Sequence, residues 1–202
     1  MNKLIFGNIE NIKPGKIFNS RKELALSLIH KPLMSGIWGR EKEGACSIVL
    51  SGGYEDDIDN INYIFYTGQG GQDVPGGNQI SDQKLTRGNK ALKVSLENSL
   101  PVRVTRGFQV KHGPASGYRY DGLYYVKSFE RVKGKSGFYI YRFYLVSKNY
   151  LKSRKVKNIE KALLKIHSKK NKNLEEIILF KKEASLGRII EKIYRNFLKL
   201  IN

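Results

Sequence analysis

Short runs of β-branched and aromatic residues, separated by glycine-rich segments, fill most of the chain before residue 147. Such runs bounded by glycine are typical of β-strands. One of them alternates cleanly and puts Val102 and Val104 on one face. Many strands at short spacing predict a curved sheet or barrel. The runs that we interpret as strands are 45–50, 63–67, 101–106, 122–129 and 137–146.

Two segments among these runs have helical features. Ser20 and Glu23 form a capping box, in which a serine precedes the first turn and a glutamate follows three residues later. This pattern predicts a helix of about two turns that ends before residue 30. Residues 83–96 have apolar positions at helical spacing and predict a second helix. The fold class is therefore α+β, and the helix residues expected to face the core are Leu24, Leu28, Ile29, Leu85, Leu92 and Leu96.

The sequence changes character near residues 147–156. Residues 147–202 contain 16 Lys/Arg, 5 Asp/Glu and a single glycine. Apolar residues recur there at the i, i+3, i+4, i+7 spacing of an amphipathic helix, from Ile159 to Ile166 and again from Leu186 to Phe197. We therefore expect one domain at residues 1–147 and a basic helical extension at residues 148–202.

The whole chain is strongly basic, with 37 Lys/Arg, 18 Asp/Glu and a formal net charge of +19. A positive charge of this size indicates a polyanionic partner such as nucleic acid. A membrane surface is also polyanionic, but the sequence has no long apolar run or lipidation signal, so we expect no membrane association. Cys46 is the only cysteine and no signal peptide is apparent. A reducing, cytoplasmic location is the simplest expectation.

Two glycine-rich segments, 51–57 and 66–71, contain the residues with the clearest binding chemistry. Tyr54 and Tyr66 lie twelve positions apart, each beside glycines, and carboxylates lie between them. Glycine lets backbone approach a flat ligand closely, and tyrosine rings can enclose a planar aromatic group. A carboxylate accepts a hydrogen bond from an exocyclic amino group such as N4 of cytosine. These segments therefore predict a binding site for one nucleobase.

Six further motifs occur around these two segments, each weak evidence alone. Together they resemble the SET- and RING-associated (SRA) domain, also named the YDG domain after the motif at 120–122. The resemblance covers about residues 5–147 and looks like the bacterial branch, in which the domain often precedes an HNH nuclease. The motifs are FGNI at 6–9, HKPLMSGI at 30–37, SGGYEDD at 51–57, YTGQGG at 66–71, DQKL at 82–85, PVRV at 101–104, YDGLY at 120–124 and GKSGF at 134–138.

The resemblance implies a crescent-shaped β-barrel that grips duplex DNA and extrudes one modified cytosine into a pocket. Tyr54 and Tyr66 match the rings that stack on the extruded base, and Asp57 matches the carboxylate that accepts the N4 hydrogen. These contacts offset an unstacking cost of a few kcal/mol. A niche for the 5-methyl group adds on the order of 1 kcal/mol, which predicts preference rather than exclusivity. The other matching pocket positions are Ser51, Gly52, Gly53 and Thr67.

In the family two loops enter the duplex. Met34, in the loop at 31–36, is the expected apolar wedge that replaces lost stacking, and Ser35 lies beside it. The second loop, 75–80, is shorter here than in the vertebrate pattern and lacks its basic residue, so we expect loose reading of sequence context or none. Asn78 and Gln79 are its expected inserting residues. The expected phosphate contacts are Arg103, Arg106, Lys111 and Arg119.

These features predict a non-catalytic module without a cofactor or metal. It would bind double-stranded DNA that contains 5-methylcytosine or 5-hydroxymethylcytosine by flipping the base. Its expected setting is the bacterial nucleoid, as the reader of a modification-dependent restriction system, with cleavage supplied by a nuclease partner or a further domain. The helices of residues 148–202 could pack on the domain, extend the DNA contact or form a homodimer.

Other interpretations of the slot residues stay open at this level. Tyr54 and Tyr66 could be ordinary core aromatics. The acidic residues at 55–59 could form a solvated turn or a metal site, and we expect at least two of them to cap turns or pair with arginine. The motif at 120–122 is expected to maintain the fold.

A compact endonuclease and a protein-interaction module with a helical tail are the alternative functions. Asp73, Asp82 and Lys84 superficially resemble the acidic–acidic–lysine set of a metal-dependent nuclease. The histidines lack metal-ligand or HNH spacing, and Cys46 lies in an apolar run, so we expect these residues to be structural or at the surface. The histidines are His30, His112 and His167.

Overall fold

The computed structural model describes residues 3–153. By its internal contacts the chain divides into a unit of residues 1–148 and a unit of residues 149–202. The helices expected at 159–166 and 186–197 lie outside the described residues. None of the described helices is long and apolar enough to cross a membrane.

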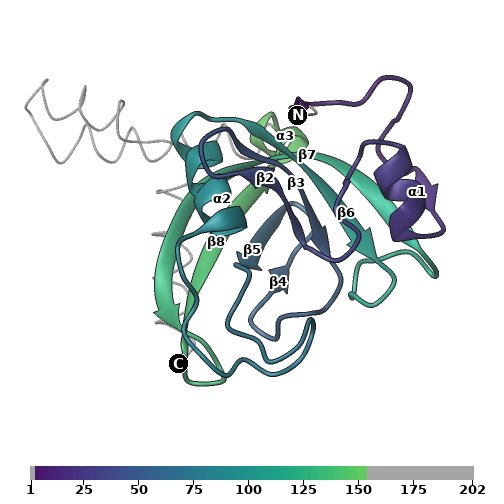
Figure 1. Cartoon of the computed structure of the whole chain (residues 1–202). Coiled ribbons are helices and arrows are strands. Elements are labelled where there is room, and N and C mark those ends of the chain that lie inside the picture. Colours follow the sequence, from purple (N-terminus) through teal and green to yellow (C-terminus); the bar gives the residue numbers. More distant parts are fainter. Residues whose placement is uncertain (1–2, 154–202) are drawn as a thin grey trace, which may run out of the picture. The chain divides into compact units, whose positions relative to one another are not determined.

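A single mixed sheet forms the framework of the first unit (Figure 1). Its strands run in the order β2-β3-β6-β7-β8-β5-β4, and β1 pairs with β7. The end strands β2 and β4 do not pair with each other within the described residues, so of the two expected forms, a curved sheet or a barrel, the structure has an open sheet. The strands are β1 (Ile17–Phe18), β2 (Ile37–Arg40), β3 (Gly44–Leu50), β4 (Ile58–Asp59), β5 (Tyr63–Thr67), β6 (Pro101–Gly107), β7 (Tyr118–Lys133) and β8 (Tyr139–Ser147).

The parallel pair of β3 and β6 determines where the glycine-rich segments lie. Ile48 of β3 lies opposite Val104 of β6, and every residue of β3 is buried. Parallel neighbours need a long crossover connection. That crossover, residues 51–100, contains β4, β5 and α2 (Arg87–Glu97). Both segments that carry the predicted nucleobase site therefore belong to one crossover, at the edge of the sheet where β3 ends.

β7 is much longer than the sequence predicted because Gly122 lies inside the strand instead of bounding it. Gly122 has a φ of +97°, which favours glycine. It pairs with Val104 of β6, and the register shifts between Val104 and Thr105. A bulge of this kind redirects a side chain. Here it lies beside Asp121, whose carboxylate contacts Arg106 of β6.

The first predicted helix is confirmed as α1 (Arg21–Leu26). The Ser20 side chain caps it by accepting a 3.2 Å hydrogen bond from Glu23 N. Leu24 and Ile29 are buried with Phe18 in a small cluster. Leu28 is 39% exposed, so its predicted core position is wrong. The residue follows the end of the helix and has a φ of +60°, which turns it away from the helical face.

The second helix, α2, begins at Arg87 rather than near residue 83. Asp82 and Gln83 instead pair with β8, because the Asp82 carboxylate accepts a 2.8 Å hydrogen bond from Tyr139 N and Gln83 N donates to Tyr139 O at 2.8 Å. α2 packs on β2, β3 and β7. Its Leu92 is buried in the main core with Val102, Val104 and Phe143, and Leu96 packs against it. A short helix, α3 (Lys148–Leu151), follows β8.

Candidate functional site

The two glycine-rich segments come together where β5 ends. Tyr66 and Thr67 are the last residues of β5, whereas Tyr54 and Asp57 lie in the turn between β3 and β4. Thr67 N donates a 2.7 Å hydrogen bond to the Asp57 carboxylate and so joins the two segments. We call Tyr54, Asp57, Tyr66 and Thr67 the slot.

Asp57 is a partly buried carboxylate that no arginine or lysine of the described residues pairs with. Burial raises the pKa of Asp57 to about 7, against the lowering effect of its hydrogen bonds with Thr67. The charges of Asp56 and Asp59 raise this pKa further. A carboxylate in such surroundings gains stability from any ligand that donates a hydrogen bond to it.

The Thr67 hydroxyl is the second incompletely bonded group of the slot. Thr67 is 1% exposed, and its Oγ1 makes no hydrogen bond of normal geometry to the described part of the chain. It lies close enough to Asp57 to lower the pKa of that carboxyl. A buried polar group left unsatisfied costs about 1–3 kcal/mol. A polar ligand in the slot would remove that cost.

The two slot tyrosines lie in different environments. Tyr54 is half-buried, and its hydroxyl accepts a 2.9 Å hydrogen bond from Gly70 N. Tyr66 is 3% exposed and belongs to the main core cluster. Burial raises the pKa of both phenols, and the charge of Asp57 raises both further, so the three groups lie near one another. Neither ring packs on another aromatic ring within residues 3–153.

Tyr66 is thus also a core aromatic, as the alternative interpretation supposed. Gly36 lies against its hydroxyl, because a Cβ added at Gly36 would be 2.6 Å from Tyr66 Oη. The loop before β2 therefore covers the Tyr66 side of the slot. A flat ligand can reach the face of this ring only if the surrounding loops separate.

Ser51, Gly52 and Gly53 form the turn that leads into the slot. Gly52 has a φ of +73°, in the left-handed region that glycine tolerates. Gly53 O accepts a 2.6 Å hydrogen bond from Gln72 Nε2. A Cβ added at Gly52 would lie 3.7 Å from Gln109 Cβ. Loops from two other parts of the chain therefore border this turn.

Met34 projects from the first predicted DNA-inserting loop and is 78% exposed. Arg21 of α1 supports this loop, since its Nε donates to Leu33 O at 3.1 Å and its Nη2 donates to Pro32 O at 3.0 Å. Ser35 is less available than predicted, because its hydroxyl donates a 2.9 Å hydrogen bond to a backbone carbonyl two residues later.

His30 anchors the other end of this loop as a satisfied core histidine. It is fully buried, and its ring nitrogens contact Ser47 Oγ at 2.8 Å and Ser35 O at 2.9 Å. Burial lowers the pKa of His30 to about 3, with the nearby Arg21 and Arg103 acting in the same direction. The imidazole is therefore neutral, and its role here is structural.

The second loop holds itself together through amide side chains. Gln79 Nε2 donates to Gly70 O at 3.0 Å and to Ser81 O at 2.7 Å, so this amide supports the loop instead of projecting from it as predicted. Gln72 and Gln79 form an isolated β-bridge. Asn78 is exposed, as its predicted role requires.

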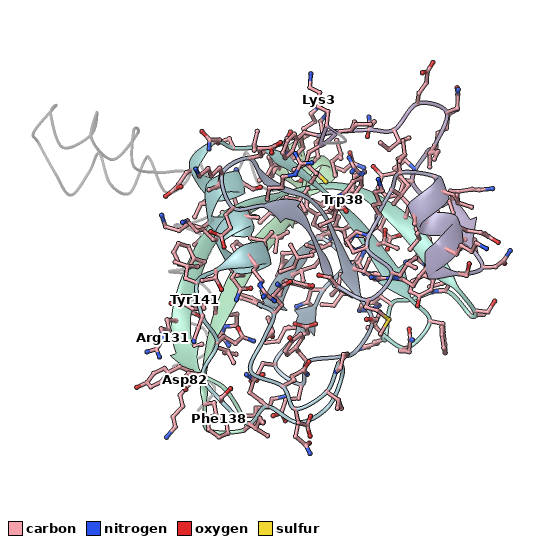
Figure 2. All side chains as sticks on the ribbon, viewed as in Figure 1. Lys3, Trp38, Asp82, Arg131, Phe138 and Tyr141 are labelled. Carbon is pink, nitrogen blue, oxygen red and sulfur yellow. The ribbon has the colours of Figure 1, made fainter. Side chains whose placement is uncertain are left out.

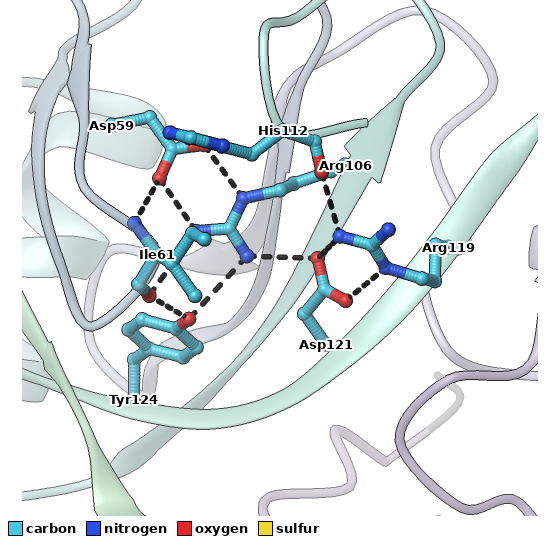
Figure 3. A network of polar contacts seen from close by, with 7 residues as sticks. All are labelled: Asp59, Ile61, Arg106, His112, Arg119, Asp121 and Tyr124. Atoms are coloured by element: carbon cyan, nitrogen blue, oxygen red, sulfur yellow. Dashed lines mark hydrogen bonds and ion pairs between the residues drawn. The ribbon is translucent and has the colours of Figure 1, made fainter. Parts of the chain in front are cut away.

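Arg106 does not have the predicted role of a phosphate contact. Its side chain is fully buried at the centre of a charge network (Figure 3). Nε and Nη2 each lie 2.6 Å from the Asp59 carboxylate, and Nη1 lies 2.8 Å from Asp121. Burial alone would lower the pKa of Arg106, but these carboxylates raise it above its ordinary value. The guanidinium therefore stabilises the fold and cannot reach DNA in this structure.

Arg103 is likewise buried, so its predicted phosphate contact is also wrong. Its Nε donates to Ile29 O at 3.0 Å, and its Nη1 donates to Ile5 O at 2.7 Å and Gly7 O at 2.8 Å. The guanidinium also faces the ring of Trp38. It holds the N-terminal arm against the sheet. The strand that bears Arg103, β6, is covered on both faces.

The two remaining phosphate candidates differ in availability. Lys111 is exposed in the loop after β6. Arg119 is partly exposed, but its guanidinium bonds to Asp121 and donates to His112 O at 2.6 Å. Lys111 therefore stays a candidate as predicted, and Arg119 has mainly internal partners.

The acidic run is structural at several positions, as expected. Asp59 pairs with Arg106 and accepts a 2.9 Å hydrogen bond from Ile61 N. Asp56 accepts from Lys135 N at 3.1 Å, in the β7–β8 hairpin. In residues 3–153, no group of three or more His, Cys, Asp or Glu side chains is arranged to hold a metal ion.

A cavity of about 330 Å³ lies next to the slot rather than in it. It shares Gly70 with the hydrogen bond of Tyr54. Of the residues considered for a nuclease, Asp82 and Lys84 line this cavity. The Asp82 carboxylate, however, forms an ion pair of 2.7 Å with Arg131, and Figure 2 labels both residues. Asp73 accepts a hydrogen bond from the next residue, Val74. The lining comprises Gln69, Gly70, Gly71, Ser81, Asp82, Lys84, Thr86 and Arg87.

Sequence reasoning missed the polar residues that position the slot loops. Asn89 of α2 holds Gln69 at both backbone groups, accepting from Gln69 N at 2.8 Å and donating to Gln69 O at 3.0 Å. Gln72 and Arg21 hold the adjacent loops. The sequence did contain a signal for them, because several asparagine and glutamine residues lie within and just after the glycine-rich loop. Glycine alone cannot fix a loop conformation, so such side chains are needed to hold it.

Known proteins resemble this chain in sequence and in fold. The model of the SAD/SRA domain family matches residues 5–149. E3 ubiquitin-protein ligase UHRF1 from Rattus norvegicus is 41% identical over 162 residues, which cover 69% of this chain but 21% of that protein. A histone-lysine N-methyltransferase, SUVH4 from Arabidopsis thaliana, is 44% identical over 154 residues, covering 70% of this chain and 25% of that protein. The chain thus spans about a quarter or less of these relatives.

Two solved structures are also similar in fold. The modification-dependent TagI restriction endonuclease matches with a TM-score of 0.70 and 41% identity, covering 73% of this chain and 53% of that chain. The SRA domain of SUVH5, bound to fully hydroxymethylated CG DNA, matches with a TM-score of 0.62 and 40% identity. This second match covers 70% of this chain and 93% of that chain.

Proposed function

Because this chain belongs to the SAD/SRA domain family, we propose that it binds double-stranded DNA containing 5-methylcytosine or 5-hydroxymethylcytosine. The modified base swings out of the duplex and enters the slot. Related SRA domains supply the first support, since solved SUVH5 structures carry fully methylated or fully hydroxymethylated CG DNA.

The single observation that carries this proposal is the pair of incompletely bonded groups, Asp57 and Thr67. The Asp57 carboxylate has a pKa raised to about 7 by burial, and the Thr67 hydroxyl is buried without a full partner among the described residues. The N4 amino group of cytosine offers hydrogens that such oxygens accept. Donation from N4 favours the ionised carboxylate, so base binding lowers the pKa of Asp57.

The tyrosines supply the stacking surfaces. Tyr54 lies in the turn after β3, and its hydroxyl accepts a hydrogen bond from Gly70 N. Tyr66 is fixed in the core. We propose that the base enters when the turn bearing Tyr54 moves away from the fixed ring of Tyr66. Stacking on an aromatic side chain contributes about 1–3 kcal/mol per base.

Charge and an apolar wedge assist the extrusion. The net charge of +19 brings the protein to duplex DNA whatever its sequence. Met34, 78% exposed on its supported loop, fills the gap left by the base. The likeness to TagI supports a role as the reader in modification-dependent restriction, with cleavage by another domain or partner.

Binding to matched duplexes tests the proposal. Fluorescence anisotropy compares duplexes that differ at one position, carrying cytosine, 5-methylcytosine or 5-hydroxymethylcytosine. Wild type should prefer a modified duplex by roughly fivefold or more, the value of about 1 kcal/mol for a buried methyl group. Tyr54→Ala should remove this preference and keep the salt-sensitive background, while the exposed Tyr139→Ala serves as control. Equal affinity of wild type for all three duplexes would refute the proposal.

The endonuclease alternative has its own test. Methylated plasmid is incubated with the protein and Mg²⁺ or Mn²⁺. Cleavage by wild type that Asp82→Ala abolishes would establish a catalytic role, whereas an intact plasmid agrees with a reader that lacks its nuclease.

A further inference from the structure

We propose that the loop of residues 108–113, led by Phe108, is a third DNA-contacting element beside the slot. The inference rests on the proposed function and extends it to a surface that the sequence motifs did not mark. Phe108 contacts the duplex next to the extruded nucleotide, and Lys111 contacts a phosphate there.

Phe108 is an exposed aromatic residue on a loop that Val110 anchors to the main core. It is 53% exposed, more than any other large aromatic side chain in residues 3–153. It follows β6 directly, and two residues later Val110 packs against the main core. The Phe108 ring is thus exposed to solvent between the buried strand β6 and the partly buried Val110. Burying that ring against a partner would remove apolar surface from water.

Hydrogen bonds fix the shape of this loop in advance. Phe108 N donates to Gly117 O at 3.0 Å, and Gly113 N donates to Val110 O at 2.8 Å. Arg119 holds His112 O at 2.6 Å, and Figure 3 shows that Arg119 belongs to the Arg106 network. A contact surface that is already ordered loses little conformational entropy when it binds.

The loop borders the turn that leads into the slot. A Cβ added at Gly52 would lie 3.7 Å from Gln109 Cβ, and one added at Gly107 would lie 3.4 Å from Leu50 O. The same turn contacts the second loop, where a Cβ added at Gly53 would lie 3.8 Å from Gly76 Cα. In Figure 1 the loop after β6 and the segments around β4 lie on the same lower side of the unit. DNA that delivers a base to the slot therefore passes beside Phe108.

The chemistry of the loop fits a nucleic acid better than a protein. Lys111 is exposed three residues from Phe108, and the chain as a whole carries a charge of +19. An apolar ring next to a cation matches DNA, which offers base and sugar surfaces beside each phosphate. A protein partner for so basic a chain would have to be strongly acidic.

Phe108→Trp gives a direct test, because indole emission changes when nucleobases approach. The only other tryptophan is Trp38, and wild type supplies its background. Titration with the methylated duplex should quench Phe108→Trp strongly and leave Ile5→Trp near the wild-type background. Ile5 is a suitable control because it is 40% exposed and two residues from Lys3, which Figure 2 shows at the top of the view.

Affinities separate the two roles within the loop. Phe108→Ala should weaken binding of the methylated duplex by about threefold to tenfold with an unchanged salt slope, since no phosphate contact is lost. Lys111→Ala should reduce the salt slope by about one unit on modified and plain duplexes alike, whereas Lys3→Ala should not.

Three outcomes are decisive. The inference is overturned if the emission of Phe108→Trp is not quenched at saturating DNA and Phe108→Ala binds with wild-type affinity. A change of oligomeric state in Phe108→Ala, measured by light scattering, also overturns it and assigns the ring to contact between copies. If wild type binds all duplexes equally but either duplex quenches Phe108→Trp, the proposed function fails while the loop contact stands.

Discussion

Asp57 and Asp59 lie two residues apart in one acidic turn, yet their surroundings are opposite. Asp59 receives two hydrogen bonds of 2.6 Å from the buried Arg106. Burial alone would raise the pKa of Asp59, but these bonds lower it below its ordinary value. Asp57 has no such cation within residues 3–153, and burial raises its pKa to about 7. The charge of Asp59 is therefore balanced by a buried arginine, whereas that of Asp57 is not.

The difference separates architecture from recognition. Evolution of a stable fold favours partners for buried charge, because an uncompensated ion costs free energy. A carboxylate left without one, beside the buried Thr67 hydroxyl, marks a place where a ligand supplies the missing hydrogen bonds. By this criterion Arg106 and Asp59 hold the scaffold, and Asp57 and Thr67 recognise the base.

The largest effect is expected at the compensated site. Arg106→Ala leaves the Asp59 and Asp121 carboxylates without their shared cation, and breaking a buried pair in this way costs about 3–5 kcal/mol of unfolding free energy. Urea denaturation followed by circular dichroism measures it. Arg131→Ala, which breaks the exposed pair with Asp82, is the control and should cost no more than about 1 kcal/mol. Similar losses in the two variants would contradict the structural role of the network.

The next largest effect is expected on binding at the uncompensated site. Asp57→Ala removes the acceptor of the N4 hydrogen, and a hydrogen bond to a charged group contributes about 1.5–3 kcal/mol. Affinity for the methylated duplex should fall roughly tenfold to a hundredfold. The unfolding free energy near pH 7 should change little, because losing the hydrogen bond from Thr67 N offsets the removal of a buried carboxylate. Asp59→Ala should show the reverse pattern, with lost stability. If Asp57→Ala lost stability but kept its preference for the methylated duplex, the two aspartates would not differ in role.

A smaller effect is expected in the pH dependence of stability. The pKa of Asp57 is raised from 3.8 to about 7 in the folded protein, so its contribution is fully present below pH 3.8 and is lost as the pH rises through 7. Wild type should therefore lose roughly 1 kcal/mol relative to Asp57→Asn between pH 6 and pH 8. Chemical denaturation at several pH values measures this difference. A constant difference across this range would show that the carboxyl titrates normally.

Strands and motifs followed from the sequence because both are local. The runs at 63–67 and 101–106 are strands β5 and β6 with nearly the predicted bounds, since β-branched and aromatic residues favour that conformation. The capping box located the start of α1, because Ser20 and Glu23 act within one turn. The family resemblance followed from the order of its motifs.

Partners across the sheet could not be predicted in the same way. Arg103 and Arg106 were expected to contact phosphates, but both faces of their strand, β6, are covered. Gly122 resembled a strand end, and only pairing with β6 shows it to be part of a bulge. Whether Asp57 or Asp59 finds an arginine depends on residues about 50 positions away, which spacing within the motif does not reveal.

Arg103 has a consequence for where this domain begins. Its guanidinium is buried against the backbone oxygens of Ile5 and Gly7, so these two oxygens balance part of its charge. A protein shortened to start at residue 8 would lose both of these acceptors and keep the hydrogen bond from Arg103 Nε to Ile29 O. Residues 5–7 are therefore part of the folded domain, because their backbone oxygens hold the buried guanidinium.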